Sequence, residues 1–184
     1  MIVPREIQTH DAVADHYDDL DTIYRGLWGL DVHHGYWRTG RESPDEAVAA
    51  LSALVGGELG FAAGADLVDI GCGYGGTARR FAEHGARVTG LSLSREQIAH
   101  APTAAGVDLR CADWLANGLP SASFDGAYAI ESSEHMTDKF GFFREARRVL
   151  RPNGRLVVCA WLASDEPTGW QIRHLLEPIC REGR

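Results

Sequence analysis

The chain has 184 residues, of which 45% are hydrophobic and 24% charged, a composition typical of one globular domain with a sizeable core. Its formal net charge of -8 argues against a nucleic-acid partner, because neutralising phosphates requires clustered Lys and Arg. We interpret the densest basic stretch, residues 144–151, as a solvated helix face. No apolar run approaches the ~20 residues that a membrane span requires.

The cysteines and the N-terminus indicate an intracellular protein. None of the four cysteines (Cys72, Cys111, Cys159 and Cys180) forms a CxxC pair, so neither a zinc site nor a thioredoxin-type motif is predicted, and no metal is expected. Buried, reduced thiols are the simplest interpretation. Residues 1–19 are polar and acidic, unlike a signal peptide, so we expect a cytoplasmic location.

The N-terminal third has helical character. Apolar residues recur three or four apart over residues 9–30, which predicts a helix. A loop rich in His, Gly and aromatic residues follows at 32–37. Ser43 and Glu46 then form a predicted capping box around Pro44, opening a helix that we expect to end at Gly56-Gly57.

From residue 65 onward, strand and helix patterns alternate. We expect helices over 76–84, 95–101 and 138–150 and strands over 66–70, 87–93, 107–112, 124–130 and 155–160. Ser94 and Gln97 are expected to form a capping box, and Pro152-Asn153-Gly154 to break the chain before the last strand. The pattern predicts an α/β fold, Rossmann-like and doubly wound, with a mostly parallel sheet and a ligand at the carboxyl ends of its strands.

Three segments follow from this division. Residues 1–60 are expected to form a helical lid, residues 61–165 a ligand-binding domain, and residues 166–184 the start of a C-terminal cap.

A glycine-rich turn, Asp69–Gly76, joins the first predicted strand to the next helix. Glycines at such a junction permit positive φ and let a ligand approach the backbone, and the helix start offers free N–H groups. A tight turn without any ligand is the alternative. The turn alone does not decide which ligand it serves.

Three ligand classes compete for this turn. Gly71, Gly73 and Gly76 satisfy the dinucleotide pattern GxGxxG, but no acid stands about 20 residues on to hold a ribose diol. A P-loop requires a Lys after the last glycine, where Thr77 stands instead. S-adenosylmethionine (SAM) has no phosphate, and Asp69 suits its positively charged end. SAM is therefore the favoured ligand.

Asp69–Gly75 resembles the first motif of class I SAM-dependent methyltransferases. Residues 88–97 resemble the second motif of a small-molecule branch similar to γ-tocopherol methyltransferase, with cyclopropane-fatty-acid synthases and glycine-betaine-forming N-methyltransferases as more distant relatives. The resemblance covers most of residues 14–165. It implies a Rossmann-like fold, SAM as cofactor and S-adenosylhomocysteine (SAH) as product.

The same resemblance implies roles for particular residues. Ser92 and Gln97 would hold the ribose in place of the usual acid, beside Leu93. Asp113 would bind the adenine amino group, and Trp114 would pack on the ring. The glycine turn would supply the remaining contacts of this region: Asp69, Gly71, Cys72, Gly73 and Gly75.

Residues 131–136, Glu-Ser-Ser-Glu-His-Met, resemble the Glu-Ser-Gly-Glu-His-Met segment of the tocopherol-type enzymes. Residues 142–154 resemble the helix and turn before their fifth strand. Complete members of this branch continue well beyond this point. The chain is therefore expected to be a truncated product, or to be completed by a second chain or by oligomerisation, because an open sheet edge is usually covered.

His135 is the first candidate for a catalytic base. Methyl transfer from a sulfonium is an in-line displacement, and a hydroxyl nucleophile also needs its proton removed. His135 follows the fourth predicted strand, although it could merely hydrogen-bond a neighbour. Glu131 and Glu134 are the next candidates, but Glu131 could line the cofactor pocket, and Glu134 could act only on the dipole of the following helix.

A second cluster, His33, His34, Tyr36 and Trp37, is expected to close over the cofactor and contact the substrate. Two adjacent histidines cannot both face one pocket from a regular element, so at most one of them is expected to act. Aromatic packing of an N-terminal arm is the alternative. Resemblance to the cyclopropane synthases places Tyr17 and Tyr36 near the methionine carboxylate.

The favoured function is methylation of a small, natural-product-like acceptor at carbon, oxygen or nitrogen. One alternative is a non-catalytic or incomplete SAM-binding fragment that needs a partner chain. A weaker alternative is a nicotinamide-dependent oxidoreductase, which the absence of an acid near Leu93 disfavours.

Overall fold

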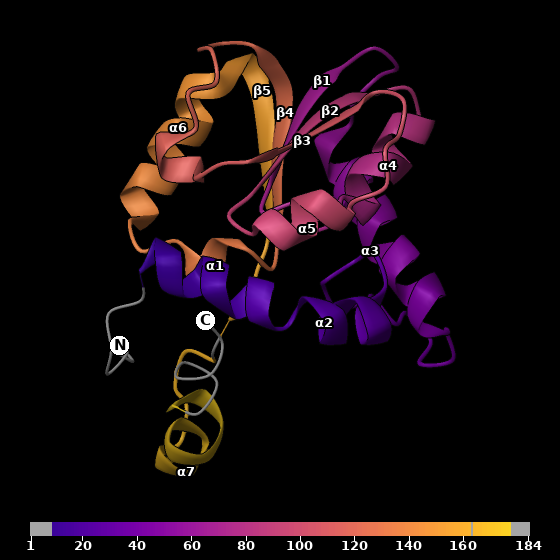
Figure 1. Ribbon diagram of the computed structural model, residues 1–184. Helices are drawn as coiled ribbons and strands as arrows, with labels where there is room; N and C mark the ends of the chain where they lie inside the picture. Colours follow the sequence, from indigo (N-terminus) through magenta and orange to yellow (C-terminus); the bar gives the residue numbers. More distant parts are fainter. Residues whose placement is uncertain (1–8, 163, 178–184) are drawn as a thin grey trace.

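A five-stranded parallel sheet forms the centre of the computed structural model, which describes residues 9–162 and 164–177 (Figure 1). Its order is β3-β2-β1-β4-β5. The strands are β1 (Asp66–Ile70), β2 (Arg87–Ser92), β3 (Val107–Cys111), β4 (Phe124–Ile130) and β5 (Leu150–Cys159). The strand order reverses between β1 and β4, where a ligand site is expected. The predicted doubly wound α/β fold is confirmed.

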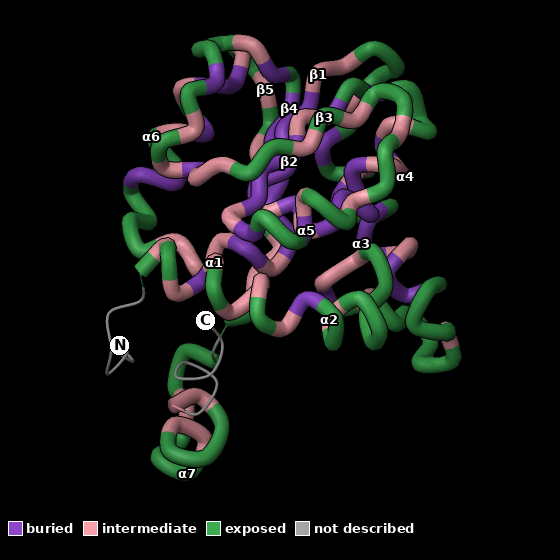
Figure 2. The backbone as a smooth tube through the Cα atoms, viewed as in Figure 1, coloured by how far each residue is buried: buried purple, intermediate pink, exposed green. Residues whose placement is uncertain are grey.

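Helices cover both faces of the sheet. α3 (Pro44–Leu59) and α4 (Gly76–Glu83) pack on one face, and α6 (Lys139–Val149) packs on the other. α5 (Arg95–His100) lies beside β2 and β3. Two short 3-10 turns, η1 (Trp114–Ala116) and η2 (Ser133–His135), follow β3 and β4. Figure 2 shows the buried residues concentrated along the strands.

The core divides into two clusters because neighbouring residues of a strand point to opposite faces. Val68 and Ala127 pack toward Phe142 of α6, whereas Leu67 and Tyr128 pack toward α3 and α4. All five side chains are 1% exposed or less. A sheet covered on both faces by apolar side chains has rigid strand ends, which position the loops at its carboxyl edge.

The single helix predicted over 9–30 is two helices, α1 (His10–Asp19) and α2 (Asp21–Trp28), and that prediction was wrong. Leu20, between them, has φ -98° and ψ 5°. Two tertiary bonds flank this joint: Asp18 accepts from Ser94 Oγ at 2.5 Å, and Asp21 accepts from Tyr74 Oη at 2.7 Å. These anchors direct the two helices separately over the carboxyl edge of the sheet.

α3 begins as predicted but ends later. The Ser43 capping box forms, with Glu46 N–H donating to Ser43 Oγ and Ser43 N–H donating to Glu46 Oε2. Gly56-Gly57 does not stop the helix, which continues to Leu59 and ends at Gly60 with φ 62°. Burial of Leu59 against the sheet outweighs the low helix propensity of the glycines.

β5 differs most from its predicted start. The strand begins at Leu150 rather than Arg155, because the predicted break is a bulge within it. Phe124 pairs with Leu150 and Gly126 with Arg155, so residues 151–154 loop out opposite a single residue of β4. Asn153 has φ 68°, in the left-handed region, which asparagine tolerates.

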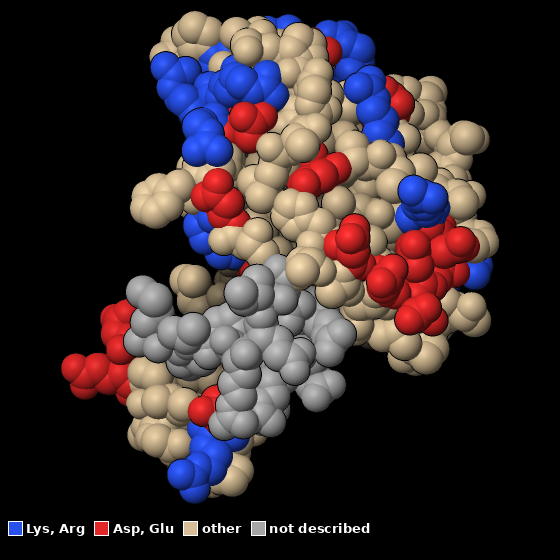
Figure 3. All heavy atoms as spheres, turned by 60° about the vertical axis from the view of Figure 1, so that its left-hand side comes forward, with Lys and Arg blue, Asp and Glu red and all other residues tan. Residues whose placement is uncertain are grey.

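The basic stretch at 144–151 is only partly a solvated helix face. Arg148 is about one-third exposed and bonds Glu145 at 2.7 Å, Asn117 Oδ1 and the Leu119 carbonyl. Arg151 belongs to β5 and pairs with Asp125 at 2.7 Å. The face drawn in Figure 3 carries separate groups of both charge signs.

The rest of the chain adds little to the sheet. α7 (Gly169–Gln171) and a π-helical turn, η3 (Ile172–Leu176), follow β5. Across the described ranges, none of the helices combines the length and apolar character that crossing a membrane requires. Cys72, Cys111 and Cys159 are free thiols, but only Cys72 is buried as predicted, since Cys111 is exposed and Cys159 is partly buried; Cys180 lies outside the described residues.

Candidate functional site

One pocket lies at the switch point, between the carboxyl ends of the strands and the N-terminal helices. Most of the predicted site residues line it: Tyr17, His33, Asp69, Gly71, Cys72, Gly73, Ser92, Leu93, Gln97, Trp114, Glu131 and His135. The other predicted residues do not: His34, Tyr36, Trp37, Gly75, Asp113 and Glu134. The pocket thus brings together residues that are far apart in the chain: Tyr17, His33, Asp69, Ser92 and His135.

Of the two glycines Gly71 and Gly73, only Gly73 leaves free space beside its backbone for a ligand. Gly71 and Gly73 have φ of 81° and 54°, in the region that favours glycine. An added Cβ at Gly71 would lie 2.4 Å from Cβ of Ser132, whereas one at Gly73 would meet only Val32, at 3.7 Å. Gly71 therefore permits close packing, and Gly73 leaves backbone accessible to a ligand.

Gly75 serves the fold rather than the pocket lining. It is the N-cap of α4 with φ 77°, and an added Cβ would lie 2.7 Å from Cδ1 of Leu109. The prediction that the turn gives way to a helix at Gly76 is confirmed.

Two carboxylates give the pocket a negative wall. Asp69 at the end of β1 is 4% exposed, and the Asp31 side chain is 11% exposed. Burial raises the pKa of Asp69 to about 7, and the neighbouring Asp31 carboxylate contributes to the rise. Asp31 is itself paired with Arg80 at 2.6 Å. A positively charged ligand group beside Asp69 would favour its ionised form.

The opposite part of the pocket offers a hydroxyl and an amide. Ser92 Oγ donates to Gln97 Oε1 at 2.7 Å, and both side chains are buried. The predicted capping box forms only in part: Ser94 Oγ accepts from Gln97 N–H at 3.0 Å, but the Gln97 side chain turns to Ser92 instead. The end of β2 thus presents Ser92 and Leu93 where a dinucleotide site would present an acid.

Of the two residues after β3 that were predicted to bind the adenine, only Trp114 lines the pocket. Trp114 is 2% exposed, lines the pocket and donates its indole N–H to the Phe142 carbonyl at 3.2 Å. Asp113 instead caps η1 by accepting from Leu115 N–H, and it lies 2.7 Å from His10 Nδ1. Asp113 therefore ties the start of α1 to the sheet edge.

Tyr17 and His135 meet inside the pocket. The Tyr17 hydroxyl lies 3.1 Å from His135 Nε2, with ring centroids 5.8 Å apart at 90°. Burial raises the pKa of Tyr17 well above its usual range and lowers the pKa of His135. Tyr17 thus keeps its proton beside a neutral imidazole, and the tautomer of His135 decides which of the two groups donates the hydrogen bond between them.

The two acids of the 131–136 segment have different surroundings. Glu131 lines the pocket at the end of β4 with φ 51°, and its Oε2 accepts from both the backbone N–H and Nδ1 of His34. Glu134 lies outside the lining and accepts from Trp161 N–H at 2.7 Å. Glu134 thus holds the chain after β5, whereas Glu131 faces the ligand space.

The adjacent histidines point in different directions because the loop that carries them is irregular. His33 is 7% exposed, lines the pocket and has Nε2 3.3 Å from Thr77 Oγ1. His34 extends to Glu131. Tyr36 and Trp37 are 43% and 44% exposed and lie outside the lining. The loop thus contributes His33 to the pocket lining, whereas His34, Tyr36 and Trp37 lie outside it.

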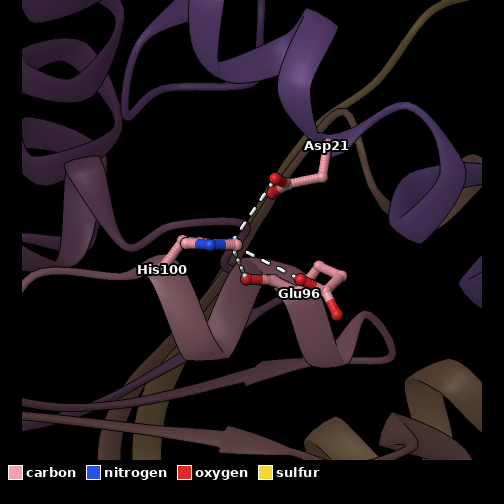
Figure 4. Close-up of side chains that lie close together, drawn as sticks. All are labelled: Asp21, Glu96 and His100. Carbon is pink, nitrogen blue, oxygen red and sulfur yellow. Dashed lines mark hydrogen bonds and ion pairs between the residues drawn. The ribbon is translucent and has the colours of Figure 1, made fainter.

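A cluster of Asp21, Glu96 and His100 has oxygen and nitrogen atoms close enough for a metal (Figure 4). His100 Nδ1 lies 3.4 Å from Asp21 and 3.6 Å from Glu96. Arg25 already bonds Asp21 Oδ2 at 2.8 Å, so a cationic partner is in place. The cluster is best explained as a set of ionic contacts that connect α2 to α5.

Several lining residues were missed in the sequence. They are His10, Val13, Leu30, Asp31, Val32, Gly76, Thr77, Leu91, Ser94, Ala112, Ile130, Ser132 and Met136. Asp31 could have been predicted as a site residue, because it lies just before the paired histidines His33 and His34. The apolar members carry no signal that separates a pocket wall from the core.

Residues 68–158 match the family described as methyltransferase domain. This range runs from the middle of β1, just before the glycine turn, to the penultimate residue of β5 and contains the switch point. Over these residues the chain is therefore similar to a methyltransferase domain.

Curated relatives agree with this assignment. The chain is 40% identical over 169 residues to 27-O-demethylrifamycin SV methyltransferase of Amycolatopsis mediterranei, covering 88% of the chain and 62% of that protein. It is 30% identical to a probable chloroplastic tocopherol O-methyltransferase of Oryza sativa, covering 92% of the chain and 53% of that protein. The chain thus spans less than two thirds of these relatives. The predicted resemblance to tocopherol-type methyltransferases is confirmed.

Solved structures share the fold. The cyclopropane synthase MmaA2 of Mycobacterium tuberculosis has a TM-score of 0.78 at 28% identity, covering 97% of this chain and 69% of that one. The [4+2]-cyclase SpnF has a TM-score of 0.78 at 32% identity, covering 85% and 61%. Because one of these similar proteins is a cyclase, the chemistry of this chain has to be argued from its site.

Proposed function

We propose that this chain is the catalytic domain of an enzyme that transfers the methyl group of SAM to a hydroxyl oxygen of a small, natural-product-like acceptor. The observation that carries the proposal is the meeting, in one pocket, of the open glycine turn, the Ser92–Gln97 pair and the Tyr17–His135 pair. Relatives named as O-methyltransferases support oxygen as the acceptor atom, whereas two relatives of similar identity are named as C-methyltransferases, so the product screen below decides between them.

The chemistry of the pocket wall fits SAM. The open backbone at Gly73 and the acids Asp69 and Asp31 suit the methionine end with its positive charges, and Ser92 with Gln97 suits a ribose diol. Trp114 provides a flat apolar wall for the adenine. When bound, SAM supplies an electrophilic methyl carbon. We propose further contacts from Leu93 and Cys72.

The base is His135 acting through Tyr17. In the tautomer that carries its proton on Nδ1, Nε2 of His135 accepts from the Tyr17 hydroxyl, so Tyr17 can take a proton from an acceptor hydroxyl as it passes its own to the imidazole. The lowered pKa of His135 keeps the imidazole neutral and ready to accept. The contribution of such a base is typically 10²- to 10⁴-fold in rate.

The N-terminal segment acts as a lid in this proposal. Asp18 and Asp21 fasten α1 and α2 to Ser94 and Tyr74, and His10 reaches Asp113. The described part of the predicted lid, residues 9–60, would close over the cofactor, with His33 against the methionine end. Tyr36, Trp37 and Glu134, which lie outside the lining, would act only if the acceptor extends beyond the pocket mouth.

We also propose a cellular location and a form of assembly for the protein. The free thiols fit the reducing cytoplasm. A homo-oligomer or a partner chain is proposed to cover β5, which is an edge strand among the residues that the structure describes.

A product-mass screen tests the function. The protein is incubated with SAM and panels of phenols, alcohols, amines and sugars, and products are sought that gain one methylene mass together with SAH. We expect methyl ethers. Methylated amines or ring carbons would move the acceptor atom to nitrogen or carbon. SAH binding without any methylated product would favour a cyclase-like role, as the similarity to SpnF allows.

A further inference from the structure

A histidine–carboxylate pair lies just outside the pocket and has no part in the proposed methyl-transfer step. His34 Nδ1 is 2.9 Å from Glu131 Oε2, and the His34 backbone N–H donates to the same oxygen at 3.1 Å. A carboxylate only accepts hydrogen bonds, so Nδ1 must carry the ring proton. In the tautomer that carries its proton on Nδ1, Nε2 has the lone pair and can accept a hydrogen bond from a ligand.

Two tryptophans fix the plane of this imidazole. Trp28 from the end of α2 lies edge-on to His34, with centroids 5.0 Å apart at 75°. Trp161, which follows β5, lies edge-on from another side at 4.7 Å and 79°. Ring orientation is thus set by two aromatic contacts and a charged hydrogen bond, which is more than an unused surface side chain requires.

The group remains open to solvent. The side chain of His34 is 49% exposed, while Trp28 and Trp161 are 37% and 60% exposed. Among residues 9–162 and 164–177, no hydrogen-bond partner reaches His34 Nε2. An oriented acceptor atom between exposed aromatic rings suits a ligand that carries both a donor and a flat ring.

Glu131 connects this group to the pocket. Its side chain is 14% exposed and lines the pocket, and its φ of 51° is costly for a residue with a Cβ, on the order of 1–2 kcal/mol. Backbone strain of this kind persists where surrounding contacts demand it, and it is frequent at functional sites. Here the left-handed conformation occurs in the residue whose carboxylate joins His34 to the ligand space.

We propose that His34, oriented by Glu131, Trp28 and Trp161, binds the methyl acceptor by accepting a hydrogen bond from a hydroxyl on an aromatic ring. The acceptor ring lies against the exposed edges of the two tryptophans, and the reacting oxygen points into the pocket. This inference rests on the proposed function. It assigns His34 to holding the acceptor, whereas the Tyr17–His135 pair removes the proton.

A ligand series tests the assignment without needing the natural acceptor. α-Naphthol has the ring and the donor, α-methoxynaphthalene has the ring without a donor, and cyclohexanol has a donor without an aromatic ring. Affinities for the SAH-saturated protein are measured by ligand-observed NMR. We expect α-naphthol to bind about three- to tenfold tighter than α-methoxynaphthalene, the value of one net hydrogen bond. It should also bind tighter than cyclohexanol, which lacks the ring contacts with the tryptophans.

Two variants separate the parts of the site. His34→Phe keeps a ring between the tryptophans but removes Nε2, so it should lower the α-naphthol affinity about three- to tenfold and leave α-methoxynaphthalene unchanged. Trp161→Ala should weaken both aromatic ligands and leave cyclohexanol unchanged. Trp170→Ala is the matched control, because Trp170 is 64% exposed and has its own histidine neighbour, His174, at 5.3 Å.

Equal binding of α-naphthol by the wild type and His34→Phe would overturn the assignment, as would an equal loss in Trp170→Ala or no α-naphthol binding at all. SAH binding is measured first on every variant. If the wild type fails to bind SAH, the proposed function fails, and the α-naphthol series on the free protein still decides the role of His34. If SAH binds normally but α-naphthol, α-methoxynaphthalene and cyclohexanol bind with equal affinity, only the present inference is refuted.

Discussion

The hydroxyl of Tyr17 lies 3.1 Å from Nε2 of His135, joining residues 118 positions apart. Tyr17 belongs to α1 and His135 to the turn after β4. Their contact exists only when the N-terminal helix is closed over the carboxyl edge of the sheet. If residues 9–60 act as the proposed lid, closing it also assembles the proposed base.

Replacing Tyr17 with Phe should separate proton removal from binding. Tyr17→Phe keeps the ring packing but removes the hydroxyl that meets His135, so we expect kcat to fall about 100-fold at saturating SAM, within the range of acid–base catalysis. Steady-state kinetics with an acceptor from the product screen measures it. Tyr24→Phe is the control, because its hydroxyl meets His16 at 3.1 Å and it does not line the pocket. An equal loss in both variants would assign Tyr17 a merely structural role.

Asp69 should make cofactor affinity depend on pH. Its folded-state pKa is about 7, and a positively charged ligand group favours the carboxylate, so binding must release a proton at lower pH. We expect SAH affinity to rise by up to about tenfold per pH unit between about pH 5 and pH 7 and then to level off. Asp69→Asn should bind about tenfold more weakly at neutral pH and lose most of this slope. Calorimetric titrations at several pH values measure both effects, and the same slope in the variant would point to another group.

The same group affects the stability of the free protein with the opposite sign. Because folding raises the pKa of Asp69, its stabilising contribution is fully present below the ordinary value of 3.8 and is lost as pH rises toward about 7. Asp69→Asn should therefore unfold at a higher temperature than the wild type in mildly alkaline buffer. Thermal melts compare the two proteins, and a less stable variant there would contradict this electrostatic account.

Gly73 should be the sensitive position of the glycine turn. An added methyl group there meets only Val32 at 3.7 Å and otherwise enters the ligand space. We expect Gly73→Ala to lower SAH affinity at least about tenfold, since a backbone that a ligand must approach closely is then blocked. Gly118→Ala is matched in strain, with φ 66° and open surroundings, and lies outside the pocket lining. Both variants should lose about 1–2 kcal/mol of stability, and only Gly73→Ala should lose binding.

The Asp21–Tyr74 bond should hold the lid. Burial alone would raise the pKa of Asp21, but hydrogen bonds from Tyr74 and Arg25 lower it below its usual value. Its contribution is therefore present above the ordinary pKa of 3.8 and is lost as pH falls through the lower folded value. Tyr74→Phe leaves one buried oxygen without its donor and should cost about 1–3 kcal/mol. Hydrogen exchange of α1 and α2 measures it, and unchanged protection would show that the lid depends on other contacts.

Much of the fold followed from local pattern. β1 and β4 agree with their predicted bounds, and β2 and β3 each end one residue before their predicted ends. These elements were predictable because alternating apolar strands and capped helices are specified locally. Where tertiary contacts override local preference, prediction failed. Gly56-Gly57 remains helical because Leu59 is buried, and the helix over 9–30 bends between two anchored aspartates.

The site was predictable where a residue lies in a motif and unpredictable where it depends on contact between distant segments. Asp69, Gly73, Ser92 and Gln97 line the pocket as expected. The pairing of His34 with Glu131 requires the N-terminal loop to reach across 97 positions of sequence, and no local signal encodes such a contact. Their proposed roles remain predictions that the variants above test.

Calorimetric titration of the wild-type protein with SAH tests the central claim most directly, namely that the pocket beside the glycine turn holds this cofactor. The account predicts one binding site per chain, a rise in melting temperature with ligand concentration, and loss of both effects in Gly73→Ala but not in Gly118→Ala. Absence of heat and of thermal stabilisation at millimolar SAH, or equal binding by both glycine variants, would contradict it.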